Sequence, residues 1–193
     1  MEGGVMPEIM LTSIGDSYTD RSNPSTNYGS AYILGIDYTL SSPFRHCQPF
    51  LHFSVASIPP NKIIDSAFFH IYVIDNAGIS ANNRIYTLKT NWTEMALTWN
   101  NKPFPKTYIT GSLFFNKIGW INVGVTELIQ LWYAEAENNY GITIEPEYKT
   151  WPYGRAYFYS REVTPFAPYI VVNYSNITTR PLWTNVNNNL SVI

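Results

Sequence analysis

Short segments rich in β-branched and aromatic residues recur along the 193-residue chain, and residues that favour turns separate them. One of these segments, residues 48–57, alternates Phe50 and His52 with Leu51 and Phe53, as a strand with two different faces does. About ten such segments can be recognised: PEIMLTSIGDSYTD, SAYILGIDYT, QPFLHFSVAS, SAFFHIYVID, RIYTLKT, TYITGSLFFN, GWINVGV, YGITIEP, RAYFYSRE and PYIVVNYS. This succession predicts an all-β fold, namely a jelly-roll-type antiparallel β-sandwich.

One segment departs from the strand pattern. Leu128, Leu131 and Trp132 recur at the spacing of one face of a helix, and Glu127 precedes them, where an acidic side chain suits the helix dipole. We therefore expect one short amphipathic helix, over about residues 125–136, that covers one end or edge of the sandwich.

The chain length suits one large domain or two very small ones. We expect a single β-sandwich domain over residues 1–176 and a C-terminal extension over residues 177–193. The extension is too apolar for a solvated tail. It either folds back on its own domain or adds a strand to the sheet edge of a neighbouring subunit, which would give homopolymers. The apolar residues expected to make that assembly contact are Leu182, Trp183, Val186, Leu190 and Val192.

Charge is scarce in this sequence. Charged residues make up 13% of the chain, against roughly 25% in ordinary soluble domains, and the net charge of −2 gives no basic footprint for nucleic acid. No stretch approaches the length of a membrane-spanning helix, and no signal peptide is visible. The low charge and the 15 tyrosines are typical of extracellular β proteins and of subunits that pack against copies of themselves. We expect a location outside the cell or on the surface of a cell, spore or virion.

Cys47 is the only cysteine, so no intrachain disulfide can form. It lies beside His46 and near His52, which leaves open a nucleophilic pair or part of a metal site. The alternative is a half-buried thiol in a strand. His70 lies far along the chain, so no separated cluster supplies the missing partners. We expect no catalytic residue and no metal here.

Acidic residues raise two further alternatives. Paired carboxylates could make a glycosidase, but none lies in a recognisable catalytic signature, so we expect no enzyme. Asp16, Asp20 and Asn23 offer oxygen ligands that suit calcium, although their spacing does not match an EF-hand loop. Turn capping by these side chains is the simpler interpretation. We expect no cofactor, with calcium as the one that stays open.

The triplet Asn-Tyr-Gly occurs twice, each time after a polar turn and before an apolar segment. Asparagine tolerates left-handed backbone and glycine permits positive φ, so both triplets favour corners of the fold. We expect structural roles for all six residues, which are Asn27, Tyr28, Gly29, Asn139, Tyr140 and Gly141.

Trp92 and Trp99 lie seven residues apart in NWTEMALTWNNKP. Two exposed rings would make a platform for sugars, whereas two buried rings would hold the fold together. The odd spacing would place them on opposite faces of one continuous strand. We therefore expect a bend at NWTE, held by Glu94, and a short strand or edge segment at ALTWNN. On this interpretation Trp92 covers an end of the sandwich and Trp99 packs in or against the core.

Several motifs follow one another in a particular order over roughly residues 10–175. They are P-x-x-N-Y-G, NWTE followed by TWNN-x-P, V-T-E-L, N-Y-G-I, and F-x-S-R-E before P-Y-I-V-V. In this order the chain resembles the DNRLRE domain family, the disaggregatase-related repeat, whose members include family 96 carbohydrate-binding modules. The resemblance implies a jelly-roll β-sandwich that is usually extracellular and non-catalytic. The chain departs from the family pattern at Gly124, where an Asp is usual, and at Ala167-Pro168, where Arg-Pro is usual.

Three functions stay open at this point. Low charge, tyrosine richness and the apolar extension favour a self-assembling structural subunit of an extracellular filament, spore appendage or virion, with other copies of itself as partners. The resemblance favours a carbohydrate-binding module for a polysaccharide, and the aromatic rings expected to stack on sugars lie close to one basic residue. These candidate contacts are Trp151, Tyr153, Arg155 and Tyr157. The third is a weak enzyme. We predict the assembly subunit, with the carbohydrate-binding module as the alternative.

Overall fold

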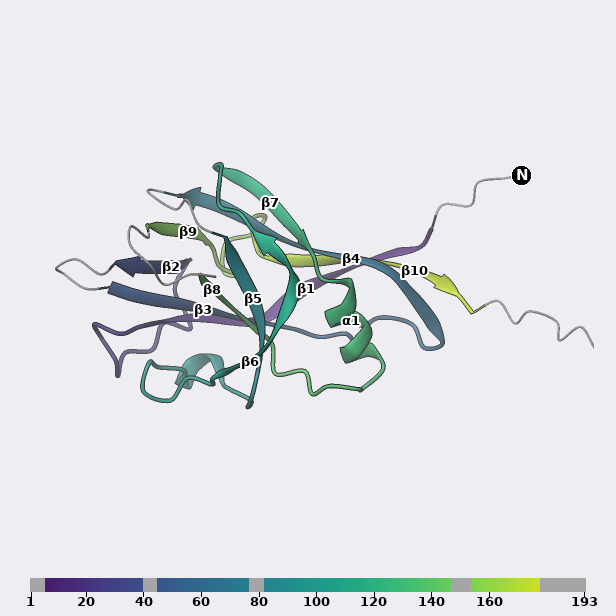
Figure 1. Cartoon of the computed structure of the whole chain (residues 1–193), viewed down its shortest axis with the longest axis horizontal. Coiled ribbons are helices and arrows are strands. Elements are labelled where there is room, and N and C mark those ends of the chain that lie inside the picture. The colour runs from purple at the N-terminus through teal and green to yellow at the C-terminus, as the bar shows by residue number, and fades with distance from the viewer. Residues whose placement is uncertain (1–5, 40–44, 77–81, 147–153, 178–193) are drawn as a thin grey trace, which may run out of the picture.

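The computed structural model describes residues 6–39, 45–76, 82–146 and 154–177. Over these residues ten β-strands are joined by turns, one short 3-10 helix and one α-helix (Figure 1). The strands are β1 (Glu8–Asp20), β2 (Ile33–Thr39), β3 (Arg45–Phe53), β4 (Lys62–Asp75), β5 (Asn83–Leu88), β6 (Pro105–Leu113), β7 (Gly119–Gly124), β8 (Ile142–Pro146), β9 (Arg155–Tyr159) and β10 (Tyr169–Asn176). The expected all-β, sandwich-like fold with one short helix is confirmed.

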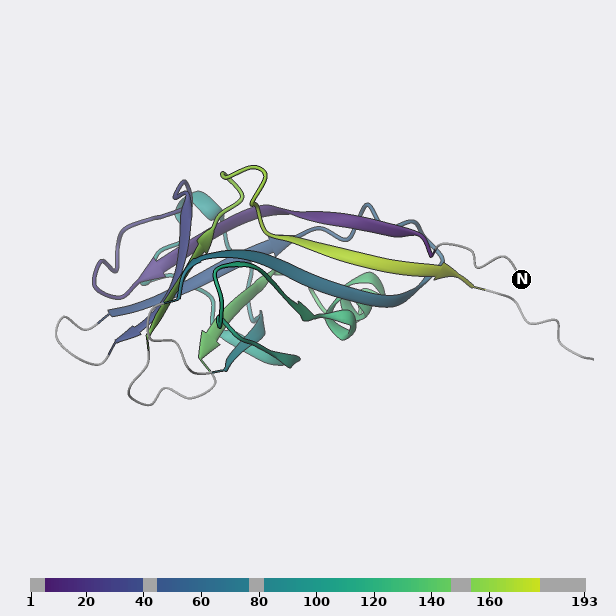
Figure 2. The same ribbon diagram turned by 90° about the horizontal axis from the view of Figure 1, so that it is seen from above.

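The strands pair antiparallel in the order β1-β10-β4-β9-β2-β3-β8-β5-β6. β10 and β9 pair with successive parts of one edge of β4, and β7 pairs with its opposite edge. β1 also closes this sheet on itself, because its first half pairs with β10 and its second half with β3. The change of partner falls at a register shift between Ser13 and Gly15. The result is a flattened barrel in which the first and last strands lie side by side (Figures 1 and 2).

The core lies inside this barrel and follows from strand alternation. In β4 the side chains of Phe69, Ile71 and Val73 are fully buried, whereas the residues between them are only half-buried. Successive side chains of a strand point to opposite faces, so each strand supplies one face to the core and one to the outside. Other strands contribute Leu34, Ile36, Leu51, Phe53, Ile85, Ile142, Ile144, Phe158 and Ile170.

The α-helix α1 (Thr126–Tyr133) covers one end of the barrel and buries Leu128, Ile129 and Trp132. It is shorter than the expected 125–136. The chain leaves the helix at Ala134, whose N–H donates to the Gln130 carbonyl, and Glu135 then adopts a left-handed φ of 54°. That conformation ends a right-handed helix.

The segment before β6 packs a second, smaller cluster of buried side chains, Phe50, Leu88 and Leu97, with Trp92 and Tyr140 at its edge. The expectation of a strand at ALTWNN is wrong, because this segment forms a 3-10 helix over Glu94–Ala96 and then turns.

Local side-chain bonds explain that difference. The Asn101 amide donates to the Ala96 carbonyl at 2.8 Å, and its oxygen accepts the Thr98 N–H at 2.7 Å. Such bonds replace those of a strand ladder.

Two further sequence expectations concern the ends of the chain and its environment. The assembly residues Leu182, Trp183, Val186, Leu190 and Val192 lie outside the described residues, so the division into residues 1–176 and 177–193 stays a prediction. Within the described ranges, no helix has the length and apolar character needed to cross a membrane.

Candidate functional site

Strand β4 pairs with β7, β10 and β9 (Figure 1). Aromatic rings gather on the outer face of this part of the sheet. Tyr72 on β4 pairs directly with Trp120 on β7, and His70 pairs with Tyr169 on β10. Because paired residues share a face, and because Ile71, between His70 and Tyr72, faces the core, these rings point outward. Together with two neighbours they form the aromatic band: His70, Tyr72, Trp120, Tyr159, Phe166 and Tyr169.

The rings of the band contact one another in a continuous series. The Trp120 centroid lies 5.4 Å from that of Tyr72 and 5.1 Å from that of Tyr169, both edge-to-face. Tyr72 lies 5.8 Å from Tyr159 and 4.5 Å from Phe166. All six rings are half-buried. The band is therefore held in place by ring packing and still presents aromatic surface to the solvent.

A hollow of about 360 Å³ opens beside Trp120. Its walls combine aromatic and polar side chains, and its lining residues are Phe114, Asn116, Lys117, Trp120, Ile121 and Asn122. Asn116 and Asn122 are exposed, and neither amide makes a hydrogen bond to another residue that the structure describes. An amide offers two donor hydrogens and an acceptor oxygen. A ring beside two such amides can hold a ligand that has an apolar face and a rim of hydroxyls.

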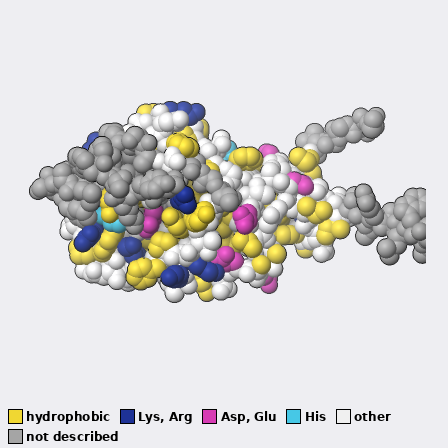
Figure 3. All heavy atoms as spheres, in the orientation of Figure 1, with side chains coloured by type: hydrophobic (Ala, Val, Ile, Leu, Met, Phe, Trp, Pro, Cys, Tyr) yellow, Lys and Arg dark blue, Asp and Glu magenta, His cyan; other side chains and the backbone are white. Residues whose placement is uncertain are grey.

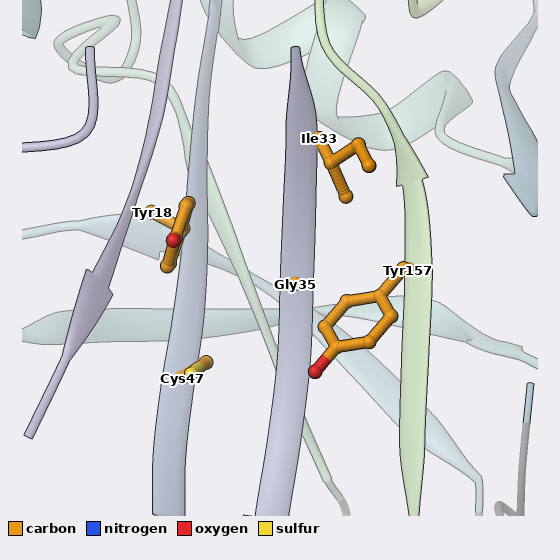
Figure 4. A pocket seen from close by; sticks show the side chains of 5 residues that line it. All are labelled: Tyr18, Ile33, Gly35, Cys47 and Tyr157. Atoms are coloured by element: carbon orange, nitrogen blue, oxygen red, sulfur yellow. The ribbon is translucent and has the colours of Figure 1, made fainter. Parts of the chain in front are cut away.

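A second hollow, of about 240 Å³, lies between β1, β3, β2 and β9 and is lined by Tyr18, Ile33, Gly35, Cys47 and Tyr157 (Figure 4). Of the four candidate sugar contacts, the structure places Tyr157 in this hollow. Arg155 lies next to it, with its guanidinium 5.6 Å from the Tyr157 ring centroid and its Nε 3.0 Å from Asp75 Oδ2. Trp151 and Tyr153 lie outside the described residues.

The cysteine and the histidines near it in sequence are not brought together. Cys47 is 3% exposed and lines the second hollow. His46 and His52 both have the opposite parity along β3 and point to its other face. There His46 packs against Trp99 at 4.7 Å and His52 lies 6.4 Å from Trp92. This arrangement gives neither a Cys–His nucleophile nor a shared metal site.

The residues considered as calcium ligands form hydrogen bonds within the protein. Asp20 accepts the Ser22 N–H at 2.8 Å and the Asn23 amide at 2.9 Å, which is a turn-capping arrangement. Asp16 accepts the Arg161 N–H at 2.8 Å. Within the described ranges, no three His, Cys, Asp or Glu side chains lie close enough to hold a metal ion. The expectation of no cofactor, with calcium left open, stays a prediction.

Glu94 lies at the centre of a polar cluster that joins distant segments. Its Oε1 accepts the Asp16 N–H at 2.8 Å and the Arg161 Nε–H at 2.8 Å, and its Oε2 accepts from Arg161 Nη2 at 2.9 Å. Glu162 lies 3.4 Å from the same guanidinium. Burial raises the pKa of Asp16 to about 7, and the nearby Glu162 and Glu94 act in the same direction.

The two Asn-Tyr-Gly triplets share one local geometry. In each, the Asn Oδ1 accepts the N–H of the glycine two residues on, at 3.1 Å. The Asn27 amide donates to the Glu94 and Leu97 carbonyls, and the Asn139 amide donates to the Phe53 carbonyl. Each triplet thus ties its own corner to a backbone segment far away in the sequence.

Both glycines of these triplets sit where a side chain would clash. A Cβ on Gly29 would lie 2.4 Å from the Glu94 carbonyl oxygen, and one on Gly141 would lie 2.4 Å from the Leu51 carbonyl oxygen. Gly141 also adopts a φ of +84°. The tyrosines have different partners: Tyr28 stacks on Tyr18 at 4.2 Å, and the Tyr140 carbonyl accepts the Trp92 indole N–H at 2.9 Å.

Trp92 and Trp99 are both half-buried. Trp92 packs 6.0 Å from Phe50 over the smaller core cluster. Trp99 lies outside both core clusters, against His46 and beneath the Lys102 ammonium, which is 4.4 Å from its ring. The buried residue of this segment is Leu97, which is 2% exposed.

The comparisons with known proteins bear on what these surfaces do. A model of carbohydrate-binding module family 96 matches residues 7–174, which is most of the chain. The chain belongs to this family of carbohydrate-binding modules. The match includes both hollows and the whole aromatic band. No curated protein matches the module. The name DNRLRE stays a resemblance.

Family membership supports carbohydrate binding, which was the alternative interpretation of the sequence, better than the self-assembling subunit that was predicted first. The described residues give no support to a homopolymer. A family of binding modules also agrees with the expectation that the chain is not an enzyme.

Sequence reasoning missed the Trp120 hollow. A signal was present in GWINVGV, where Trp120, Asn122 and Gly124 alternate with Ile121 and Val123. In the structure, Ile121 and Val123 are buried, and the other three residues are exposed or half-buried. An aromatic ring followed two residues later by an amide, on the outward face of a strand, is the pattern to look for in other sequences.

Proposed function

We propose that the module is non-catalytic and binds a polysaccharide through the aromatic band, with the Trp120 hollow as its main contact. The observation that carries this proposal is the half-buried Trp120 ring beside Asn116 and Asn122, two exposed amides that bond to no other described residue. The indole can stack on the apolar face of a sugar ring while the amides meet its hydroxyls.

The place of action follows from the ligand. Polysaccharides are components of cell surfaces and of extracellular material, so we expect the module to work outside the cell or on a surface. Family membership supports this location, because carbohydrate-binding modules are often extracellular or surface-associated. Binding there needs no bound metal, since the ring and the amides supply both the stacking surface and the hydrogen bonds.

The test compares three variants in affinity electrophoresis through gels that contain single polysaccharides. Trp120→Ala should lower affinity by at least about tenfold, as expected for a central aromatic contact. Asn122→Ala should weaken binding less. Because the Asn122 side chain is exposed, a loss of binding in this variant would not result from misfolding. The matched control is Phe104→Ala, because Phe104 is 71% exposed but lies outside the band.

Two outcomes would overturn the proposal. One is a wild-type module whose mobility in every gel that contains a neutral or acidic polysaccharide equals its mobility in a gel without polysaccharide. The other is a module whose binding persists in Trp120→Ala and Asn122→Ala alike. Thermal unfolding of each variant shows whether a loss of binding reflects a loss of fold.

A further inference from the structure

An apolar row lies on the outer face of the sheet, beside the aromatic band. The pairing register aligns Met10 on β1 with Val171 on β10, and Val171 with Phe68 on β4. Their neighbours along each strand pack into the core, so these three side chains point outward. Met10 is 58% exposed and Phe68 is 42% exposed. The apolar row of Met10, Val171 and Phe68 therefore exposes hydrophobic surface to water.

The face around the apolar row is uncharged. Gly124 on β7 pairs with Phe68 and continues the row. The next row toward the band consists of the paired residues Thr12, Tyr169, His70 and Asn122. Burial lowers the pKa of His70, so its ring is neutral at pH 7. The two rows form one uncharged surface across four paired strands, and a contiguous apolar surface of this kind marks a place where another segment binds.

The C-terminal extension starts beside this surface. β10 lies between β1 and β4, and Ile177, directly after it, is 54% exposed. If residues 178–181 reverse the chain, residues 182–193 remain, and in extended form they span roughly 40 Å at about 3.3 Å per residue. That is longer than β10, which has eight residues. The extension is thus long enough to run back over the whole strand from which it leaves.

The sequence of the extension has a period of two. Apolar residues take four of the six even positions from 182 to 192, namely Leu182, Val186, Leu190 and Val192. The odd positions between Trp183 and Ile193 are all Asn or Ser. This alternation is typical of an extended segment that lays one face on an apolar surface and turns the other to water.

Charge favours the same placement. Arg180 is the one charged side chain in residues 178–193. Glu8 on β1 and Asp65 on β4 both lie beside the end of β10. Lys62 also lies there, but its ammonium donates to Asn176 at 2.6 Å. In the view of Figure 3, Lys and Arg side chains gather toward the opposite end of the molecule, whereas acidic and hydrophobic ones are visible toward the end at which β10 finishes. A chain reversal at Arg180 therefore brings its guanidinium close to carboxylates.

We propose that residues 182–193 fold back along the outer face of β10 and cover the apolar row of the same molecule. A segment attached to the strand that it covers reaches the row at a high effective concentration, which favours the same molecule over a second copy. A reversal over residues 178–181 brings Asn188 about level with Val171, with Val186 and Leu190 on either side along the extension.

The proposed docking leaves the Trp120 hollow open. Strand β4 lies between β10 and β7, so β7 is roughly 10 Å from β10 at about 4.8 Å per strand. The inference therefore goes beyond the proposed function and does not depend on it.

Disulfide trapping tests the docking. Every variant carries Cys47→Ser, so that only the introduced cysteines react. Asn188→Cys supplies the thiol on the extension, because position 188 shares the parity of the apolar residues but holds none itself. Combined with Val171→Cys on β10, it should form a disulfide within the monomer under mild oxidation.

The matched control combines Asn188→Cys with Ala134→Cys. Ala134 is exposed and follows Tyr133, whose hydroxyl accepts the Lys62 N–H at 3.0 Å next to the end of β10. A thiol there is within reach of the extension but lies off the apolar row. The Val171→Cys pair should oxidise at least about tenfold faster than this control, because docking raises the effective concentration of its two thiols.

Two outcomes would overturn the docking. Equal oxidation rates of the two pairs would mean that the extension does not prefer the apolar row. Disulfide-linked dimers in place of cross-linked monomers would assign the row to a second copy. Within the Val171→Cys pair, Val186→Asn should slow oxidation several-fold, since it removes an apolar contact, whereas Asn187→Ala should not. Equal rates in these two variants would also contradict the proposal, and thermal unfolding shows that each variant is folded.

A chain that ends at residue 177 separates this inference from the proposed function. Removing residues 178–193 should lower the melting temperature by a few degrees, and an unchanged melting temperature would count against the docking. Retention of the shortened chain by polysaccharide gels should equal that of wild type. Absence of retention in wild type would overturn the Trp120 site and leave the cross-linking result intact.

Discussion

Arg161 and Glu94 form a two-point ion pair in which both carboxylate oxygens accept from the guanidinium, at 2.8 and 2.9 Å. Arg161 begins the loop that carries Phe166 onto the aromatic band, whereas Glu94 begins the 3-10 helix over the smaller core cluster. Glu94 also accepts the Asp16 N–H from β1. One carboxylate therefore fixes three segments that are far apart in the sequence, and one of them supports the candidate binding surface.

Removing that carboxylate should cost much more than removing an ordinary surface ion pair. Glu94→Ala removes the acceptor of the Asp16 N–H and leaves the Arg161 guanidinium with only the more distant Glu162 carboxylate, 3.4 Å away, so the free energy of unfolding should fall by about 2–4 kcal/mol. Asp75→Ala is the matched control, because the Asp75–Arg155 pair has 34% and 47% exposed side chains and should contribute less than about 1 kcal/mol. Urea denaturation measures both, and equal losses would contradict the role assigned to Glu94.

Stability should depend on pH through Asp16, because burial raises its pKa to about 7. Between about pH 4 and pH 7 the unfolded carboxyl group is ionised while the folded one still holds its proton, so the folded state binds more protons. Stability contributed by this group is therefore full below about pH 4, falls as the pH rises to about 7, and is constant above that. The total change should be a few kcal/mol, since one pKa unit corresponds to about 1.36 kcal/mol.

Asp16→Asn tests this pH dependence, because the amide resembles the protonated carboxyl group and does not titrate. The difference in unfolding free energy between variant and wild type should shift in favour of the variant from pH 4 to pH 8. A difference that stays constant over this range would show that Asp16 keeps an ordinary pKa in the folded protein. Chemical denaturation at fixed ionic strength is the appropriate measurement.

The close approach of Gly29 to the Glu94 backbone predicts a large effect of a single methyl group. Gly29→Ala would place its Cβ 2.4 Å from the Glu94 carbonyl oxygen, and relieving that overlap should cost about 2–3 kcal/mol. In Gly124→Ala the nearest atom would be 4.0 Å away, so this variant should be neutral or up to about 1 kcal/mol more stable. Thermal unfolding of the two variants gives the comparison, and similar melting temperatures would argue against the close contact.

Trp99 and Leu97 should contribute unequally although they are two residues apart. Leu97 is 2% exposed within the smaller cluster, so Leu97→Ala should cost about 2–5 kcal/mol. Trp99 contacts His46 and Lys102 outside both core clusters, so Trp99→Ala should cost about 1–2 kcal/mol. A tryptophan buried in the core would cost about 3–5 kcal/mol. A loss in that higher range would mean that Trp99 belongs to the core.

Elements with a strong local period could be predicted from the sequence. The alternation of Phe69, Ile71 and Val73 with half-buried residues identifies β4 without any tertiary information, and the apolar spacing in α1 identifies the helix. The end of that helix could not be predicted, because the left-handed backbone at Glu135 is not encoded by hydrophobic spacing. The strand expected at ALTWNN was wrong for a similar reason, because hydrogen bonds of the Asn101 side chain replace the backbone hydrogen bonds of a strand there.

The candidate binding surface could not be predicted for a different reason. Trp120, Tyr72 and Tyr159 come from three strands whose neighbours are set by long-range pairing, and no local pattern gives the order β7-β4-β9. The prediction of sugar contacts near Tyr157 used a cluster of aromatic residues in one short stretch of sequence. That approach finds rings that are adjacent in the chain and misses rings that become adjacent only in the folded sheet.

The pairing of the first strand with the last also has a consequence for how the protein is made. β1 cannot complete its backbone hydrogen bonds until β10 is available, and these strands are separated by almost the whole chain. Contacts of such high contact order form slowly, because the entropy of closing a long loop must be lost first. During synthesis at about 5–20 residues per second, the first half of β1 stays an unpaired edge until β10 leaves the ribosome. Closure of the barrel is thus a late event, which occurs only after β10 has been synthesised.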